Sequence, residues 1–265
     1  GWTDVPPYCD REGGFVCNVA INRYATARIA YDESRSAARQ PTPITRVSTD
    51  QELIVAVLRR SGITNVQVSL TSDFPVGAGL GGSSAASAAL LGAIATWRDE
   101  RLDRRAIAEE GRRIEVEDLR IAGGRQDHYA ATHGGALALR FGEAVQVKHL
   151  TLSAATREAL ERRSLLVHTG QSRTSGETIT AVMDAYRAGD ARVLSALAQM
   201  RSLAMWMATA LELGDIDQVG ALVGEHWTHQ RTLHPAIPTP RIDEIVARAA
   251  ASGACGAKAM GASGG

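Results

Sequence analysis

A glycine-rich loop stands directly ahead of a run of helix formers in the stretch FPVGAGLGGSSAASAALLGAIATW (residues 74–97). Glycines let backbone N–H groups approach an anion closely, because no side chain keeps the anion away. The N-terminus of the helix behind the loop adds partial positive charge. Ser83 and Ser84 stand where the loop becomes the helix, a position at which serine is favoured as an N-cap. This combination predicts a phosphate-binding loop.

Two well-known phosphate loops do not fit this stretch. The letters from Gly77 to Gly82 contain GxGxxG, and Asp99 follows at about the 20-residue spacing of a dinucleotide-binding fingerprint. In a dinucleotide-binding fold the loop leaves the first strand at once, whereas residues 72–75 separate the expected strand from the first glycine here. The Walker A pattern fails because no lysine follows the glycines. A nucleotide-dependent oxidoreductase remains the alternative from another class of enzyme.

Three acidic side chains lie in a second stretch of interest. Glu115 and Glu117 end an expected helix, ahead of the turn AGGRQD in which Asp127 could project into a cleft. A pair of glutamates on a charged helix is normally a solvated face, and an aspartate after two glycines is most often a turn or cap residue. The residues alone leave these interpretations open.

Further polar residues have ordinary explanations as well. Arg173, in the segment TGQSRTSGE, carries a planar guanidinium that suits a phosphate, although most of the 29 basic residues are expected to be surface charge. His226, His229 and His234 have no acidic partner in the sequence pattern, which is typical of surface or packing residues rather than of a zinc site.

The composition excludes some classes of function. The 29 basic and 29 acidic residues cancel, which argues against a nucleic-acid or membrane-surface role driven by bulk charge. No apolar run approaches the roughly 18 residues of a membrane span, and we expect no signal peptide. Three cysteines without metal-type spacing favour a reducing cytoplasm. Both ends look cut, so we expect further residues beyond each end, and the oligomeric state, including a homodimer, stays open.

The pattern along the chain predicts a mixed α/β protein. Strands are expected at residues 15–31 (one or two), 65–70, 135–150 (a hairpin) and 164–170. Helices are expected after a capping box at 49–52, then at 83–97, 104–120, 175–188, 190–213, 216–231 and 240–252. The pattern becomes helix-rich near residue 150, which predicts a domain of residues 1–150 and another of residues 151–265.

The loop from Pro75 to Ala85, Pro-x-Gly-x-Gly-Leu-Gly-x-Ser-Ser-Ala, closely resembles the phosphate-binding motif of the GHMP small-molecule kinases. Two other stretches fit that family in order. GWTDVPPYCDREGGFVCNVAIN (residues 1–22) resembles the end of its first motif and the continuation found in sugar-1-kinases, and GAKAMGASGG (residues 256–265) resembles its third motif. The basic residue of the family's upstream Pro-x-Arg or Pro-x-Lys is absent from this chain. The resemblance covers nearly the whole chain.

Within this family the chain resembles D-glycero-D-manno-heptose 7-phosphate kinases most. The similar segments are AGGRQDHYAATHGGALALRF (residues 122–141), VHTGQSRTSGE (167–177) and EHWTHQRTLHPAIPTPRIDEI (225–245). Fucokinase-type enzymes share part of this pattern, so a kinase for fucose or another sugar is the alternative within the family. A member that binds sugar or nucleotide without turnover is a third option.

The resemblance implies a role for each motif residue. The loop residues expected to bind ATP are Pro75, Gly77, Gly79, Leu80, Gly81, Gly82, Ser83 and Ser84. Ser83 is expected on phosphate, whereas Ser84 and Glu117 are expected to hold Mg²⁺, a hard cation that prefers oxygen ligands. Glu115 is the fallback, because the spacing from Glu117 to Asp127 is one residue shorter than in mevalonate-type members.

The same resemblance places the acceptor. Asp127 is expected to face the acceptor hydroxyl as general base or as its electrostatic orienter. Thr3 and Asp4 belong to a motif whose aspartate accepts hydrogen bonds from sugar hydroxyls. Arg173 is expected on the phosphate of the substrate, and Gly261 on the substrate from the third motif.

The implied fold is the two-domain GHMP kinase fold of the α/β (α+β) class. Its N-terminal half resembles a ribosomal S5 domain 2-like unit and its C-terminal half a ferredoxin-like unit, with the sugar between the domains. The implied reaction moves the γ-phosphoryl group of ATP to the anomeric hydroxyl of a heptose 7-phosphate and gives the 1,7-bisphosphate. The expected partners are a small sugar phosphate and ATP, without nucleic acid or membrane.

Overall fold

The computed structural model divides into two compact units that interleave along the sequence. The first unit consists of Gly1–Ala20, Gly77–Leu80 and Gly134–Gly265, and the second of Ile21–Val76 and Gly81–His133. The residues that the structure describes are 1–32, 51–75, 77–101, 103–170 and 176–261. The boundary expected near residue 150 falls inside the first unit, and the division into residues 1–150 and 151–265 stays a prediction about the domains.

A three-stranded antiparallel sheet belongs to the first unit, in the order β1-β4-β5. Its strands are β1 (Gly14–Val19), β4 (Ala136–Phe141) and β5 (Gln146–His149). The middle strand β4 is buried except at Arg140, which suits its run of apolar residues. The hairpin expected within residues 135–150 is confirmed by the pairing of Leu139 with Val147.

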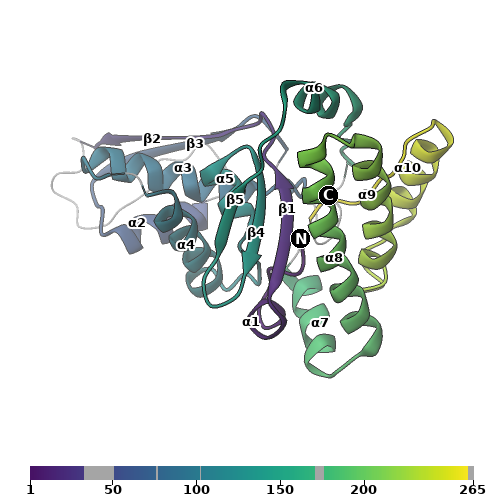
Figure 1. The fold of residues 1–265 in the computed structure, drawn as a ribbon. Helices are drawn as coiled ribbons and strands as arrows, with labels where there is room; N and C mark the ends of the chain where they lie inside the picture. The colour runs from purple at the N-terminus through teal and green to yellow at the C-terminus, as the bar shows by residue number, and fades with distance from the viewer. Residues whose placement is uncertain (33–50, 76, 102, 171–175, 262–265) are drawn as a thin grey trace. The chain divides into compact units, whose positions relative to one another are not determined.

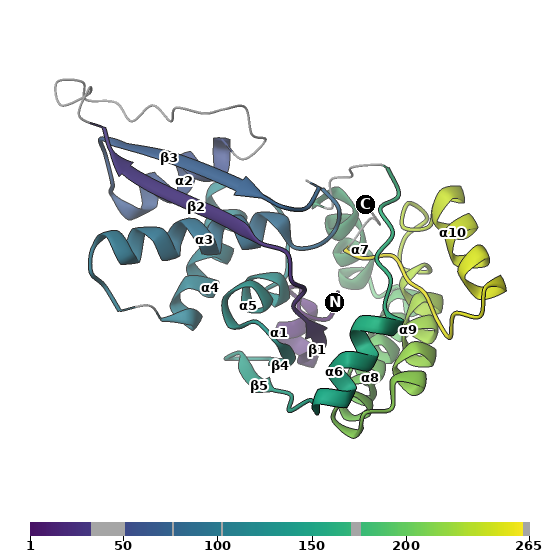
Figure 2. The same cartoon turned by 90° about the horizontal axis from the view of Figure 1, so that it is seen from above.

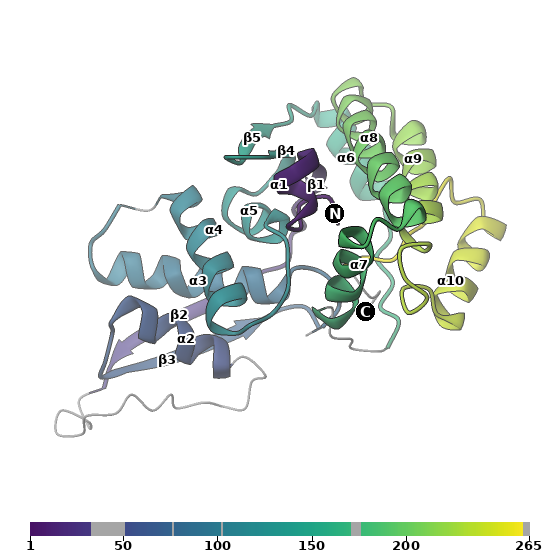
Figure 3. The ribbon, with the colours of Figure 1, turned by 90° about the horizontal axis from the view of Figure 1, so that it is seen from below.

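Helices make up most of the remaining first unit. They are α1 (Tyr8–Glu12), α6 (Ala154–Arg163), α7 (Gly176–Arg187), α8 (Ala191–Leu213), α9 (Ile216–Gln230) and α10 (Pro240–Ala251). The long helix α8 lies along β1 and contacts β4 (Figure 1). Its residues Ala208 and Leu211 share a buried cluster with Ala136, Ala138 and Leu150 of the sheet region. Helix α9 lies beside α8 (Figure 3). The bounds of α7, α8, α9 and α10 confirm the four helices expected between residues 175 and 252.

Local sequence signals explain where these helices begin and end. The side chains of Asp190, Asp215 and Thr239 each accept a hydrogen bond from a backbone N–H in the first turn of α8, α9 and α10. Helix α8 ends at Gly214, whose φ of 77° lies in the left-handed region that glycine adopts readily.

The second unit pairs two strands with a group of helices. Its elements are β2 (Ala25–Tyr31), β3 (Val66–Ser72), α2 (Gln51–Ser61), α3 (Gly82–Trp97), α4 (Arg104–Arg113), a π-helical segment (Ile114–Asp118) and α5 (Gln126–His133). Strand β2 pairs antiparallel with β3 and packs against α3 (Figure 2). The core of this unit includes Leu53, Ile54, Val57, Leu58, Val66, Val68, Leu90, Ile94 and Ile114. Two residues of the expected capping box, Thr49 and Asp50, lie outside the described residues.

Two expected elements differ from the structure. The strand predicted at residues 164–170 is wrong, because these residues form no ladder with another described strand. The apolar side chains there are exposed, with Leu165 85% exposed. The described residues from 151 onward contain helices and no strand. The helix predicted over residues 104–120 ends at Arg113 and continues as the π-helical segment.

Glycine at position 14 is required by a close backbone approach at the start of β1. A Cβ atom on Gly14 would lie 2.0 Å from the backbone oxygen of Thr3, which cannot rotate away as a side chain could. We expect Gly14→Ala to lower the free energy of unfolding by about 3 kcal/mol, the upper part of the usual range for overpacking. Urea denaturation measures this loss.

The matched control is Gly142→Ala, because a Cβ atom on Gly142 would meet no atom within 4 Å. We expect the control to unfold at nearly the same urea concentration as the unmodified protein. Equal losses of stability in the two variants would contradict the explanation by close approach.

Candidate active site

The N-terminus of α3 is built on a glycine rather than on a capping side chain. Gly81 is the N-cap residue, with a φ of 71°, and it makes no side-chain hydrogen bond to the helix. The expectation that Ser83 or Ser84 caps α3 is therefore wrong, because both lie inside its first turn. An N-terminus of this kind presents backbone N–H groups that can donate hydrogen bonds to an anion.

The carboxyl group of Asp127 lies against this N-terminus. A Cβ atom on Gly81 would lie 3.0 Å from Cβ and 3.1 Å from Cγ of Asp127, so a larger residue there would press on the aspartate. Asp127 is exposed, in the first turn of α5. Two of the residues predicted for phosphoryl transfer are thus neighbours in the second unit.

A group of polar side chains connects α3 with the π-helical segment and α5. Ser83 Oγ donates a hydrogen bond of 2.6 Å to Glu115 Oε1. Ser84 Oγ lies 3.4 Å from His128 Nδ1, and His128 Nε2 lies 3.5 Å from Glu115 Oε2. Both serines of the loop are therefore linked to one carboxylate, directly or through the imidazole ring.

Burial changes the protonation of two of these groups. Burial raises the pKa of the Glu115 carboxyl, while the hydrogen bond from Ser83 and the charge of Arg112 act in the opposite direction. Burial, together with the charge of Arg112, lowers the pKa of His128 to about 4. The His128 ring is accordingly neutral near pH 7.

The second glutamate has a different environment. Glu117 is exposed, and its Oε2 accepts a hydrogen bond of 2.7 Å from Arg60. Arg60 also forms ion pairs with Glu110 and Asp118. The geometry thus favours Glu115 over Glu117 as the partner of the loop serines, and the metal role of Glu117 stays a prediction.

The first part of the loop packs against the third motif, within the first unit. A Cβ atom on Gly79 would lie 2.8 Å from the backbone oxygen of Met260, and one on Gly261 would lie 3.1 Å from Cα of Gly79. Both glycines have positive φ, 70° and 66°. Two predicted sites that are far apart in sequence therefore touch.

Gln230 holds the third motif in place and was not among the residues predicted for the site. This side chain is 1% exposed at the end of α9, and its Nε2 donates hydrogen bonds to the backbone oxygens of Ala259 (3.3 Å) and Gly261 (3.2 Å). A lone glutamine on an apolar helix gives no local signal of such a role. Only the tertiary contact identifies it.

The predicted sugar-binding residues of the first motif are buried in the first unit. Thr3 Oγ1 donates to the backbone oxygen of Phe15 (2.7 Å) and accepts from its N–H (3.2 Å). This hydroxyl therefore braces the start of β1. Asp4 is 1% exposed. The substrate roles of Thr3 and Asp4 stay predictions.

The positions of the remaining predicted site residues do not test their expected roles. Pro75 is exposed, Gly77 has a φ of 74°, and Leu80 and Gly82 are half-buried. Arg173 lies outside the described residues. Gly77 and Leu80 belong to the first unit, and Gly82 begins α3 in the second.

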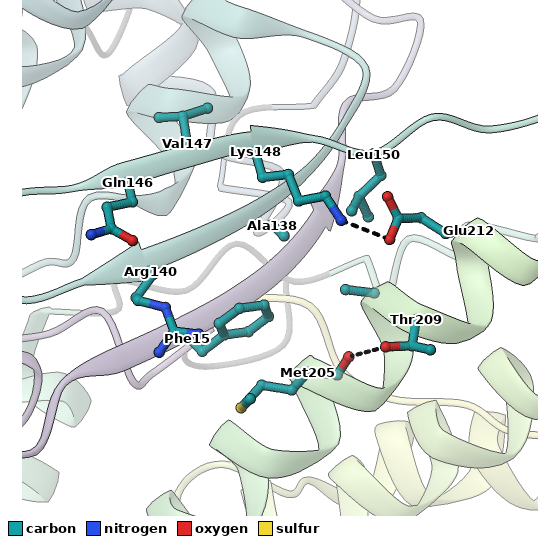
Figure 4. Close-up of a pocket in the computed structure, with 11 residues that line it drawn as sticks. Phe15, Ala138, Arg140, Gln146, Val147, Lys148, Leu150, Met205, Thr209 and Glu212 are labelled. Atoms are coloured by element: carbon teal, nitrogen blue, oxygen red, sulfur yellow. Dashed lines mark hydrogen bonds and ion pairs between the residues drawn. The ribbon is translucent and has the colours of Figure 1, made fainter.

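A separate groove of about 460 Å³ lies between the sheet and α8 in the first unit (Figure 4). It contains an ion pair of 2.8 Å between Lys148 and Glu212, and the Arg140 guanidinium lies over the ring of Phe15. None of the residues predicted for the site lines it.

The described parts of the chain contain neither a membrane-spanning helix nor a cluster of metal-binding side chains. No helix there combines the length and apolarity that crossing a bilayer requires. No group of three or more His, Cys, Asp or Glu side chains in those parts is arranged to hold a metal ion.

Family comparisons match both halves of the chain. Residues 51–135 match the N-terminal domain of the GHMP kinases, and residues 207–265 match the C-terminal domain of the same family. Together these segments make up more than half of the chain and include Ser83, Glu115, Asp127 and Gln230. The chain belongs to the GHMP kinase family. It is accordingly an ATP-dependent phosphotransferase that acts on an alcohol group, and the oxidoreductase alternative is wrong.

Individual relatives of this GHMP kinase include sugar kinases. It is 27% identical to a D-glycero-alpha-D-manno-heptose 7-phosphate kinase of Campylobacter jejuni, over 100% of this chain and 83% of that protein. It is 24% identical to an L-fucokinase/L-fucose-1-P guanylyltransferase of Bacteroides fragilis, over 93% of this chain and 30% of that protein.

A solved structure carries the same fold. A D-glycero-D-manno-heptose 1-phosphate kinase from Bacteroides thetaiotaomicron superposes with a TM-score of 0.69, covering 99% of this chain and 82% of that one at 23% identity. The GHMP kinase fold expected from the sequence is confirmed.

The donor atoms of this GHMP kinase suit a hard cation. Ser83 Oγ and Glu115 Oε1 are a hydroxyl and a carboxylate oxygen in direct contact at the N-terminus of α3. Mg²⁺ prefers oxygen ligands and usually combines one or two protein groups with phosphate oxygens. The residues present therefore fit the cation that the family resemblance implies.

Proposed function

We propose that this GHMP kinase transfers the γ-phosphoryl group of ATP to the anomeric hydroxyl of D-glycero-D-manno-heptose 7-phosphate, giving the 1,7-bisphosphate. The similarity to a heptose 7-phosphate kinase over the full chain supports this sugar. The segments AGGRQDHYAATHGGALALRF and VHTGQSRTSGE, which resemble those enzymes, support it as well.

One observation carries the phosphoryl-transfer chemistry: the carboxyl group of Asp127 lies against Gly81 at the N-terminus of α3. The backbone N–H groups of the loop and of the first turn of α3 bind phosphate oxygens. Asp127, beside that phosphate-binding backbone, accepts a hydrogen bond from the acceptor hydroxyl and takes its proton as the new O–P bond forms and the bond from the γ-phosphorus to the bridging oxygen breaks, which releases ADP. Phosphoryl transfer needs chiefly positioning and charge neutralisation, so one carboxylate suffices.

The metal ligands in this proposal are Ser83 and Glu115, in place of the expected Ser84 and Glu117. The buried Ser84 hydroxyl lies beside His128 instead. Their oxygens are 2.6 Å apart, whereas the carboxylate of Glu117 is engaged by Arg60. Mg²⁺ bound there would neutralise charge on the phosphate oxygens during transfer. The chain itself contributes the orientation of the two oxygens.

Two matched glutamate variants test this assignment. Glu115→Gln removes a negative ligand and is expected to raise the Mg²⁺ concentration for half-maximal activity at least about tenfold. Glu117→Gln is expected to leave it nearly unchanged, because an exposed ion pair with Arg60 contributes little. Initial rates over a Mg²⁺ titration at saturating ATP provide the measurement. The reverse pattern would restore Glu117 as the ligand.

The phosphate on the acceptor is assigned in part to Arg173. A desolvated, charge-assisted pair contributes on the order of 2–3 kcal/mol, or about 30- to 150-fold in affinity. We therefore expect Arg173→Ala to raise KM for the sugar phosphate by about that factor and to leave KM for ATP nearly unchanged. Equal effects on the two substrates would remove Arg173 from the sugar-phosphate site.

A panel of acceptors tests the substrate itself. ADP release is measured with heptose 7-phosphate, heptose 1-phosphate, free heptose and L-fucose at equal concentrations. We expect the highest kcat/KM for heptose 7-phosphate. Preference for fucose would support the fucokinase-like alternative, and preference for heptose 1-phosphate would move the phosphoryl acceptor to another hydroxyl. Either result leaves the kinase assignment intact.

A further inference from the structure

The imidazole ring of His128 occupies a position between three elements of the second unit. It follows Asp127 in the chain and is 2% exposed. Its Nδ1 lies 3.4 Å from Ser84 Oγ on α3, and its Nε2 lies 3.5 Å from Glu115 Oε2 on the π-helical segment. No step of the proposed reaction uses this ring.

We propose that His128 is a positioning residue that holds the Glu115 carboxylate in the orientation in which it receives Mg²⁺ beside Ser83. This inference rests on the proposed function, in which Ser83 and Glu115 are the metal ligands. His128 itself touches neither the metal nor the substrate.

The chemistry of its neighbours assigns the direction of each contact. The buried Nε2 makes no hydrogen bond in the structure, and Glu115 Oε2 lies 3.5 Å from it, so a small movement of the carboxylate brings Oε2 to the distance at which a protonated Nε2 donates to it. Nδ1 is then left to accept from the Ser84 hydroxyl. The other carboxylate oxygen, Oε1, already accepts from Ser83. Once Nε2 donates to Oε2, each oxygen of Glu115 has its own donor, and rotation of the carboxylate would cost one of them.

The ring is also held by packing. A Cβ atom on Gly111 of α4 would lie 2.9 Å from Cδ2 of His128 and 2.8 Å from Ser87 Oγ. Glycine at this helical position therefore leaves the space that the ring fills. This packing restricts the His128 ring, whose Nε2 lies 3.5 Å from Glu115 Oε2.

Two substitutions distinguish the role of Nε2 from that of Nδ1. The amide nitrogen of glutamine reaches about as far as Nε2, whereas that of asparagine reaches only as far as Nδ1. We expect His128→Asn to weaken metal binding about 10- to 100-fold, the usual effect of losing a group that orients a metal ligand. We expect His128→Gln to retain most of the affinity, because its amide nitrogen takes the place of Nε2 beside Glu115 Oε2.

The experiment is a Mn²⁺ titration followed by electron paramagnetic resonance, with the full chain and a non-hydrolysable ATP analogue. The affinity for the analogue without metal serves as a second readout, which we expect to be unchanged in both variants. Equal Mn²⁺ affinity in the Asn and Gln variants would overturn the proposal. So would equal weakening of both in step with their thermal stability, because that result indicates packing alone.

A second pair of variants keeps the test decisive if His128→Asn does not fold. Gly111→Ala pushes on the ring and is expected to weaken Mn²⁺ binding, whereas Gly92→Ala on α3 meets no atom within 4 Å and is expected to have no effect. Unchanged binding in Gly111→Ala would overturn the proposal. If Glu115→Gln leaves Mn²⁺ binding unchanged, the metal site of the proposed function fails. If Glu115→Gln weakens Mn²⁺ binding but the His128 and Gly111 variants leave it unchanged, the positioning role alone fails.

Discussion

Asp127→Asn is expected to reduce kcat by about 100- to 10,000-fold, the usual contribution of a positioned acid–base group. Asparagine keeps the size of the side chain beside Gly81 but cannot take the proton of the acceptor hydroxyl. The affinities for ATP and sugar phosphate should change little, because the side chain remains in the space that Gly81 leaves for it. Steady-state kinetics and an ATP titration separate the two effects.

The matched control for this substitution is Asp184→Asn on α7. Asp184 is an exposed aspartate whose contact is an ion pair with Arg187 within the same helix. We expect the control to retain nearly the full rate. Retention of more than half the rate in Asp127→Asn would mean that another group receives the proton.

Gly79→Ala is expected to weaken ATP binding at least about 150-fold. The new Cβ atom would lie 2.8 Å from the backbone oxygen of Met260, so the loop or the third motif must move. Backbone N–H groups of the loop can then no longer donate hydrogen bonds to the phosphates. The loss of two charge-assisted hydrogen bonds together costs about 3 kcal/mol or more. Isothermal titration with a non-hydrolysable ATP analogue measures the loss.

Gly62→Ala separates steric collision from backbone strain. Gly62 also has a positive φ, 64° against 70° for Gly79, but a Cβ atom there would meet nothing within 4 Å. Both variants carry a similar conformational strain, about 1–2 kcal/mol. Only Gly79→Ala should lose ATP affinity. Equal ATP affinity in the two would sink the phosphate-loop assignment of Gly79.

Strong local patterns predicted most of the helices correctly. Capping residues such as Asp103, Asp190 and Thr239 mark helix starts by hydrogen bonds to N–H groups two or three residues ahead. Such contacts depend only on neighbouring residues. The strand expected at residues 164–170 had an equally apolar pattern, but a strand also needs a partner, and none of the described strands pairs with it.

The local sequence pattern does not predict which of Glu115 and Glu117 contacts the loop serines. Residues two apart on a helix point to nearly opposite sides, so only one of them can face the loop serines. Which one does depends on how the segment packs against α3 and α5. In the structure Ser83 donates a hydrogen bond to Glu115, and Arg60 donates one to Glu117. Both contacts join residues that are far apart in sequence.

By itself the sequence determined the glycine-rich loop, the helix behind it, the aspartate after the GGRQ turn and the GHMP kinase family, because each depends on residue types at short spacing. Tertiary structure alone decided which glutamate meets the loop and that Thr3 braces β1. It also decided that Gln230 holds the third motif and that His128 lies between Ser84 and Glu115. These contacts join segments brought together only when the core forms, and no local pattern encodes which side chains then meet.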